Sequence, residues 1–210
     1  QVYKRKWVRK KINKSKLNIK KIRNVNFEEA LIKVLSSPNH SNKSWITNQY
    51  DQMVMGDTVQ RSGSDAAIVR IHNKDKAIAV TVDSSANYCK SQPKIGGKQI
   101  VCENWRNLIS VGAKPLAVTN CLNFGNPENE EIMGEFAECL EGIKEACEFL
   151  NYPVVSGNVS FYNGTNKKNI FPTPVIGGVG IINKLSSPIS HKLKRDKSLL
   201  LLIGKTFGHI

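Results

Sequence analysis

The fold is decided by residues 116–162, which read LAVTNCLNFGNPENEEIMGEFAECLEGIKEACEFLNYPVVSGNVSFY. The segments at its two ends, Leu116–Leu122 and Val154–Tyr162, are predicted to be strands. Between them, apolar residues recur every three or four positions with Glu and Lys opposite, which predicts a long amphipathic helix. Those apolar positions are Ile132, Met133, Phe136, Leu140, Ile143, Cys147 and Leu150.

The flanking residues continue this alternation of strands and helices. Ala66–Ile71 and Ala77–Val82 are separated by a polar turn, which predicts an antiparallel hairpin. Other predicted helices are Phe27–Leu35, a short one at Trp45–Tyr50, and one that opens at Ile95-Gly96-Gly97 and closes near Gly112; other predicted strands are Val175–Ile182 and Leu199–Ile203. We therefore predict an α/β (α+β) domain in which a mixed sheet packs against long amphipathic helices.

Length and composition predict a soluble protein that is not exported. With 210 residues and 40% hydrophobic side chains, the chain can bury one substantial core. No apolar run approaches the roughly 20 residues that cross a bilayer. The basic N-terminus is unlike a signal peptide. The five cysteines are odd in number and form no Cys-x-x-Cys pair, which favours reduced thiols in a core.

The net charge of +14 suggests nucleic-acid binding, but its distribution does not favour that function. Residues 1–25 hold 11 Lys and Arg and no acid, which leaves 20 basic and 17 acidic residues in the other 185. The basic N-terminal segment has two open interpretations, a nucleic-acid-binding tail or a solvated linker. Only Tyr3 and Trp7 could stack on bases, so we favour the linker.

Three stretches are rich in residues that can contact phosphate or a metal ion. They are Gly56–Asp65, Asn120–Pro127 and Ser156–Asn163. Glycine lets a backbone approach phosphate oxygens closely, and amide and carboxylate oxygens are ligands for Mg²⁺. The same residue types also dominate ordinary turns. The two commonest phosphate-binding loops, Gly-x-x-x-x-Gly-Lys-Ser/Thr and Gly-x-Gly-x-x-Gly, do not occur.

Several motifs in order resemble the synthetase subunit of the phosphoribosylformylglycinamidine synthase family. They are Gln49–Val54, Gly63–Arg70, Leu122–Pro127 and Ser156–Asn163, and the resemblance covers nearly the whole chain. It implies a domain like the N-terminal domain of aminoimidazole ribonucleotide synthetase. We expect an internal fragment, with residues 1–43 a basic linker and short helix, 44–184 the nucleotide-binding domain, and 185–210 a joint leading into the next domain.

The resemblance implies a cytoplasmic, ATP-dependent ligase of purine synthesis. Such an enzyme converts formylglycinamide ribonucleotide, ATP and glutamine-derived ammonia into the amidine, ADP and phosphate. ATP phosphorylates the amide oxygen and ammonia then displaces the phosphate. The implied cofactor is Mg²⁺, and the implied partners are a glutaminase subunit and a small accessory subunit. The resemblance implies neither nucleic acid nor a membrane as a partner, and we expect the fragment alone to be inactive.

Residue by residue, the resemblance assigns nucleotide contacts to Asn120 and Gly157, the ribonucleotide substrate to Ser160, and Mg²⁺ to Asn158. Asn120 stands where the family usually carries Asp, so an acceptor oxygen is kept and a negative charge is lost. Asp83, at a strand end, resembles a metal-binding acid, although a turn aspartate is the other interpretation. We predict no catalytic residue, and all four histidines as structural or solvated.

Two rival functions stay open at the level of sequence. One is another ATP-using enzyme of the same superfamily, of the selenophosphate synthetase or thiamine-phosphate kinase type. The other is a basic RNA-binding module led by residues 1–25, which would bind RNA with a steep salt dependence.

Overall fold

The computed structural model describes residues 4–9, 11, 26–50, 52–61, 63–166, 168–193 and 196–204. The chain forms two compact units, the first from Gln1–Ile12 and Met53–Lys192 and the second from Asn13–Gln52 and Leu193–Ile210. Most of the basic segment 1–25, Asp51, and 205–210 with His209 lie outside the described residues. The predicted division at residues 43/44 and 184/185 stays a prediction.

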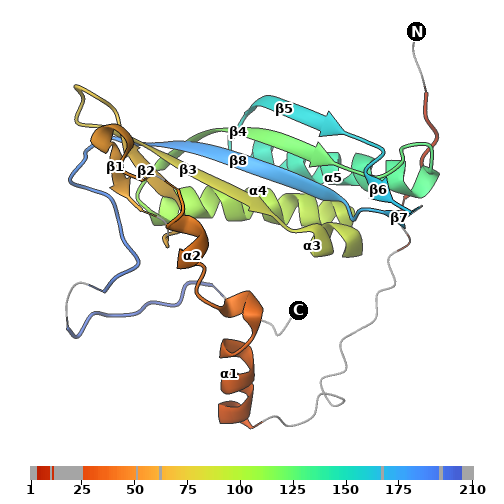
Figure 1. Ribbon diagram of the computed structural model, residues 1–210. Helices are drawn as coiled ribbons and strands as arrows, with labels where there is room; N and C mark the ends of the chain where they lie inside the picture. Colours follow the sequence, from red (N-terminus) through yellow and green to blue (C-terminus); the bar gives the residue numbers. More distant parts are fainter. Residues whose placement is uncertain are drawn as a thin grey trace. The chain divides into compact units, whose positions relative to one another are not determined.

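A six-stranded mixed sheet forms the centre of the first unit (Figure 1). Its strands are β1 (Thr58–Gln60), β2 (Ala67–Arg70), β3 (Ala77–Ser84), β8 (Thr173–Ile182), β4 (Lys114–Asn123) and β5 (Val154–Ser160), in that spatial order. Strands β4 and β5 are parallel, and every other neighbouring pair in this sheet is antiparallel. The predicted mixed sheet and the hairpin of β2 and β3 are confirmed.

Helices α3 (Ala86–Ser91), α4 (Pro93–Ser110) and α5 (Glu130–Phe149) cover one face of this sheet (Figure 1). Helix α5 begins where Asn129 accepts hydrogen bonds from the backbone N–H groups of Glu131 and Ile132, and proline opens α4. The core between helices and sheet is made of fully or nearly fully buried side chains. They include Ile68, Ile100, Leu108, Val118, Phe124, Ile143, Tyr152, Ile176 and Ile182.

A buried amide joins α4 to the sheet through this core. The Nδ2 group of Asn104 donates to the Oδ2 atom of Asp83 at 2.8 Å and to the carbonyl of Ile176 at 3.1 Å, while its Oδ1 atom accepts from the Tyr152 hydroxyl at 2.8 Å. A Cβ atom on Gly178 would collide with both Asn104 and Tyr152. Glycine at this position therefore leaves the space in which the polar groups meet.

The opposite face of the sheet is largely apolar and is not covered by any described helix of the first unit. On β3, Ile78, Val80 and Val82 alternate with buried residues and are 38%, 39% and 67% exposed. Val179 on the neighbouring strand β8 lies opposite Val80 and is 38% exposed. A sheet with two apolar faces is normally covered on both of them.

The second unit contains α1 (Phe27–Leu35), a 3₁₀ turn η2 (Pro38–His40) and α2 (Ser44–Thr47). Asn26 caps α1 by accepting from the N–H groups of Glu28 and Glu29, so the predicted helix is confirmed. The predicted strand Leu199–Ile203 is wrong, because these residues form no strand and are 81–92% exposed. The described part of the chain offers this segment no partner strand, and apolar composition alone does not make a ladder.

Candidate functional site

The two Asn-rich and Gly-rich segments of the sequence lie side by side on the parallel strands β4 and β5. In the register of this pair, Asn120 lies opposite Gly157, Cys121 opposite Asn158, and Asn123 opposite Ser160. The carboxyl ends of both strands therefore meet at one edge of the sheet, which is where open α/β sheets bind ligands.

Asn120 and Gly157 belong to the face that the helices cover. The neighbours of Asn120 along β4, Val118 and Leu122, are buried in the core, and its β8 partner Ile176 is fully buried. A Cβ atom on Gly157 would collide with the Oδ1 atom of Asn120. Glycine on the edge strand β5 therefore makes room for the Asn120 amide.

Asn120 also lines a cavity of about 730 Å³ between α5 and the start of β5. This cavity lies at the amino end of β5 and not at the carboxyl ends of β4 and β5. The cavity wall is mostly apolar and includes Leu140, Ile143, Cys147, Tyr152 and Val154. Burial raises the pKa of the Cys147 thiol to about 11 and also raises the pKa of the Tyr152 hydroxyl. Both groups are therefore neutral near pH 7.

Asn158 and Ser160 lie on the open face, one residue out of phase with Asn120 and Gly157. The Nδ2 groups of Asn158 and Asn123 approach the Sγ atom of Cys121 at 3.9 Å and 3.5 Å. The Ser160 hydroxyl accepts from the Nδ2 group of Asn163 at 3.1 Å. Cys121 and Asn123 belong to this polar surface as well. They lie in the predicted polar stretch Asn120–Pro127 but were assigned no role, although the alternation of side chains along a strand places them on one face.

The loops that follow β4 and β5 are joined by their own hydrogen bonds. The Nδ2 group of Asn163 donates to the carbonyls of Phe124 and Ser160, and the N–H group of Asn126 donates to the Oδ1 atom of Asn169 at 2.8 Å. Below them, the ring of Phe136 makes edge-to-face contacts with Phe124 and Phe161, at centroid distances of 5.1 and 4.9 Å. Much of the polar composition of these loops therefore serves their structure.

Asp83 lies on the helix-covered face of β3, the same face as Asn120, and both residues are opposite Ile176 of the strand β8 between them. Its two carboxylate oxygens accept from the Nδ2 groups of Asn104 and Asn107, each at 2.8 Å. Three strand spacings, about 14 Å, and the thickness of the sheet separate β3 from Asn158 on β5. Asp83 and Asn158 therefore cannot hold the same ion in this arrangement. No group of three or more His, Cys, Asp or Glu within the described ranges could hold a metal ion.

The cysteines and His72 have structural surroundings in the described residues. All five cysteines are free, and Cys89, Cys139 and Cys147 are buried. The Nε2 atom of His72 lies 2.9 Å from the Oδ2 atom of Asp57, which Arg70 also contacts. Arg70 and, secondarily, His72 hold the pKa of Asp57 below its ordinary value. This cluster lies at the opposite edge of the sheet from Asn158.

Residues 63–182 match the family described as AIR synthase related protein, N-terminal domain. The chain belongs to this family. The AIR synthase related domain thus comprises most of the first unit, from just after β1 to the end of β8. The predicted fold class and the predicted likeness to the N-terminal domain of aminoimidazole ribonucleotide synthetase are confirmed.

Curated relatives are described as phosphoribosylformylglycinamidine synthase subunit PurL. The protein of Pelagibacter ubique is 55% identical over 210 residues, which is 100% of this chain and 29% of that protein. A Bradyrhizobium relative is 52% identical over 179 residues, covering 85% of this chain and 24% of its own length. The chain therefore spans less than a third of the length of these relatives.

Solved structures from Thermotoga maritima show the same fold. PurLQS matches with a TM-score of 0.68 and 37% identity over 72% of this chain and 25% of that one. PurL complexed with ATP matches with a TM-score of 0.61 and 37% identity, over 68% and 24% of the two chains. PurL complexed with FGAR matches with a TM-score of 0.61 and 38% identity, over 68% and 23%. Within the described residues, none of the helices has the length and apolar character that spanning a bilayer requires.

Proposed function

We propose that this chain is part of an ATP-dependent ligase of purine synthesis that makes formylglycinamidine ribonucleotide from formylglycinamide ribonucleotide, ATP and glutamine-derived ammonia. The observation that carries the proposal is the parallel register of β4 and β5, which brings Asn120, Gly157, Asn158 and Ser160 to one sheet edge. Relatives described as PurL at 55% and 52% identity support it. So do the Thermotoga PurL complexes with ATP and FGAR.

In this proposal the two faces of the sheet at β4 and β5 bind different parts of the ligands. On the cavity side, Asn120 would hydrogen-bond nucleotide and Gly157 would let the backbone approach it. On the open side, Ser160 would bind the ribonucleotide. Because Gly157 is on the edge strand of the described sheet, a phosphate chain can pass around the edge from one side to the other.

The residues at this site could hold Mg²⁺ only if phosphate oxygens supplied most of its ligands. Asn158 is exposed, and its Nδ2 group faces Cys121, which leaves the amide oxygen available as one ligand. Mg²⁺ commonly takes one or two protein oxygens together with phosphate oxygens and waters. Asp83 as a second ligand has less support, because hydrogen bonds from Asn104 and Asn107 already account for its position.

The same proposal includes partners and compartment. PurLQS is the Thermotoga assembly that this chain resembles, and it supports a complex with a glutaminase subunit and a small accessory subunit. We place the enzyme in the cytoplasm, with neither nucleic acid nor a membrane as a partner. The open apolar face of the sheet would pack against a related half of the same enzyme. The isolated chain would then be inactive.

The test uses the full-length synthetase with its glutaminase, in which Asn158→Ala is compared with Ser156→Ala. Ser156 lies on the same strand and face as Asn158 and is also exposed, but the proposal gives it no ligand. We expect Asn158→Ala to lower kcat/KM for ATP by about tenfold or more, as loss of a charge-stabilising contact does. Ser156→Ala should change it less than about twofold.

Nucleotide that stays bound after gel filtration is measured on the same samples. If Asn158→Ala loses a retained nucleotide and stability together, the site holds a structural nucleotide. If Asn158→Ala loses turnover but keeps its stability and its bound nucleotide, the site is catalytic. Unchanged kinetics and unchanged bound nucleotide would contradict the proposal.

A further inference from the structure

The described residues of the basic N-terminal segment are exposed, but the segment contacts helix α5 through Val8 and Arg9. The N–H group of Val8 donates to the carbonyl of Glu130 at 3.1 Å, at the start of α5. One turn further along, a Cβ atom on Gly134 would collide with the carbonyl oxygen of Val8. The backbone of the segment therefore rests directly on the backbone of the helix, and only glycine at residue 134 allows this approach.

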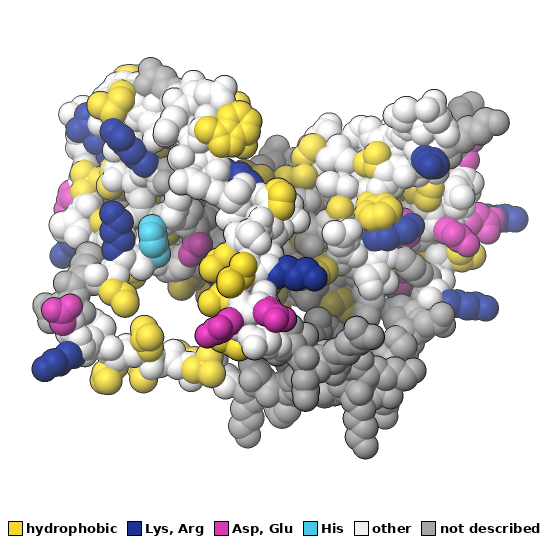
Figure 2. All heavy atoms as spheres, turned by 60° about the horizontal axis from the view of Figure 1, so that its bottom comes forward, with side chains coloured by type: hydrophobic (Ala, Val, Ile, Leu, Met, Phe, Trp, Pro, Cys, Tyr) yellow, Lys and Arg dark blue, Asp and Glu magenta, His cyan; other side chains and the backbone are white. Residues whose placement is uncertain are grey.

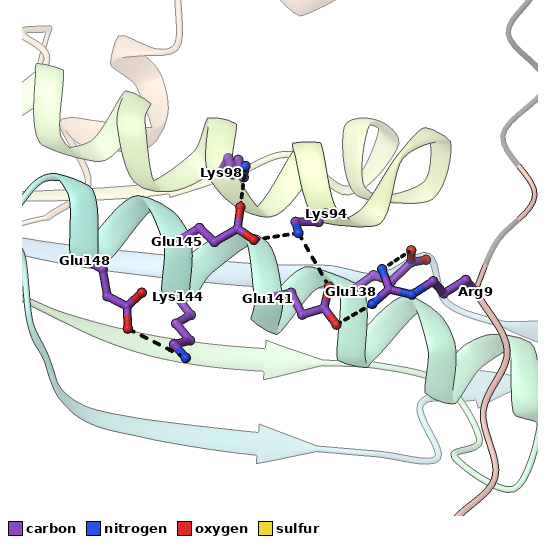
Figure 3. A network of polar contacts seen from close by, with 8 residues as sticks. All are labelled: Arg9, Lys94, Lys98, Glu138, Glu141, Lys144, Glu145 and Glu148. Carbon is purple, nitrogen blue, oxygen red and sulfur yellow. Dashed lines mark hydrogen bonds and ion pairs between the residues drawn. The ribbon is translucent and has the colours of Figure 1, made fainter.

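Arg9 fixes the segment to the same helix by charge. Its guanidinium lies 2.8 Å from Glu141 and 3.7 Å from Glu138 (Figure 3). The guanidinium also lies 5.6 Å from the ring centre of Trp7. Glu138 is only 7% exposed. Arg9 therefore places a cation beside a nearly buried carboxylate, while its own side chain is 58% exposed.

The helix carries charge that matches the segment. Helix α5 contains seven glutamates and one lysine, whereas residues 1–25 contain 11 Lys and Arg and no acid. In the face shown in Figure 2, the Lys and Arg side chains of the described residues are dispersed among acidic and neutral ones and form no single basic patch. Opposite charges on two packed elements favour their association with each other.

We propose that residues 4–9 are an intramolecular strap, and that the acidic face of α5 around Gly134 is the surface built to receive it. The strap adds a covering segment to the AIR synthase related domain from outside the family's matched residues 63–182. Its arginine is then committed to glutamates and is not offered to RNA. The proposal stands on contacts within the first unit and does not depend on the proposed enzyme activity.

The first test is hydrogen exchange of the Val8 amide in the full chain. Replacing a glycine inside a helix by alanine normally stabilises the helix. Gly134→Ala should instead accelerate exchange at Val8 by about tenfold or more, because the new methyl group displaces the strap. Unchanged or slower exchange at Val8 in this variant would overturn the proposal, and circular dichroism verifies that α5 is still formed.

The second test is a charge exchange with a matched control. Arg9→Glu should accelerate Val8 exchange by about tenfold or more, and adding Glu141→Arg should restore most of the protection. Lys6→Glu makes the same charge change in the same segment, but among the described residues Lys6 has no ion pair, so it should have little effect. Equal effects of Arg9→Glu and Lys6→Glu would show a general charge effect and contradict the strap. RNA binding that falls in Arg9→Glu while Val8 exchange stays unchanged would replace the strap by a nucleic-acid tail.

Discussion

Asn120 and Asn158 lie one register step apart on adjacent parallel strands, and their side chains are on opposite faces of the sheet. Asn120 lines the cavity against α5, and Asn158 shares the open face with Cys121. In the proposed magnesium-nucleotide site, one ligand can contact both Asn120 and Asn158 only if it passes around the edge strand β5. Variants at the two positions should therefore affect different contacts of the same ligand.

The contact between Gly157 and Asn120 gives a prediction about stability. Gly157→Ala forces a methyl group into the Asn120 amide and should destabilise the fold by about 1–3 kcal/mol, measured by urea unfolding. Asn120→Ala in the same molecule removes the amide and should recover most of the loss. Additive losses in the double variant would show that the two side chains do not compete for this space.

The buried hydroxyl of Tyr152 should contribute more to the free energy of unfolding than an exposed tyrosine hydroxyl does. Tyr152→Phe leaves the Oδ1 atom of Asn104 without its donor and should cost about 1–3 kcal/mol of unfolding free energy. The control is Tyr162→Phe, whose hydroxyl donates to Glu128 at the surface and should change stability by less than about 0.5 kcal/mol. Thermal or urea unfolding of the two variants compares them directly, and equal losses would be inconsistent with the buried network.

The ion pairs between α4 and α5 should make stability depend on acid pH. Lys94 and Lys98 each lie 2.5 Å from Glu145 (Figure 3), and these contacts lower the pKa of its carboxyl from 4.5 to about 2. Because the folded-state pKa is depressed, this contribution is complete above about pH 4.5 and is lost as the pH falls toward about 2. Glu145→Gln should flatten the curve of urea midpoint against pH in that window and leave its shape above pH 5 unchanged.

Thiol reactivity should report on the open face. Cys121 is partly exposed beside Asn158, whereas Cys89 and Cys139 have no exposed surface. Burial also raises the pKa of Cys147 to about 11, so that thiol should resist alkylation at pH 8. We expect iodoacetamide to modify Cys121 and magnesium-ATP to slow that reaction. Cys102, also partly exposed but on α4, is the control that nucleotide should not protect.

The elements with a strong period were predictable from the sequence. The amphipathic pattern from Ile132 to Leu150 placed α5 within a few residues, and the capping Asn129 marks where it begins. Helix α3 was missed, because six residues are too short to show a helical period. Leu199–Ile203 was predicted as a strand from composition alone, which cannot tell whether a partner strand exists.

The sequence predicted which segments meet at the candidate site, but not on which face of the sheet each side chain lies. The motifs around Asn120 and Asn158 do meet, because parallel neighbours bring their carboxyl ends together. That the two side chains lie on different faces follows from their positions in the register, which single segments do not reveal. The docking of Arg9 on Glu141 joins residues 132 positions apart, and no local pattern encodes such a pair.

Strand β5 ends the described sheet, and Val155 on it is 70% exposed. Its outer side presents a row of amide and carbonyl groups that the described residues leave unpaired, and such a row is a template for another chain. The isolated domain should therefore form intermolecular β-structure as its concentration rises.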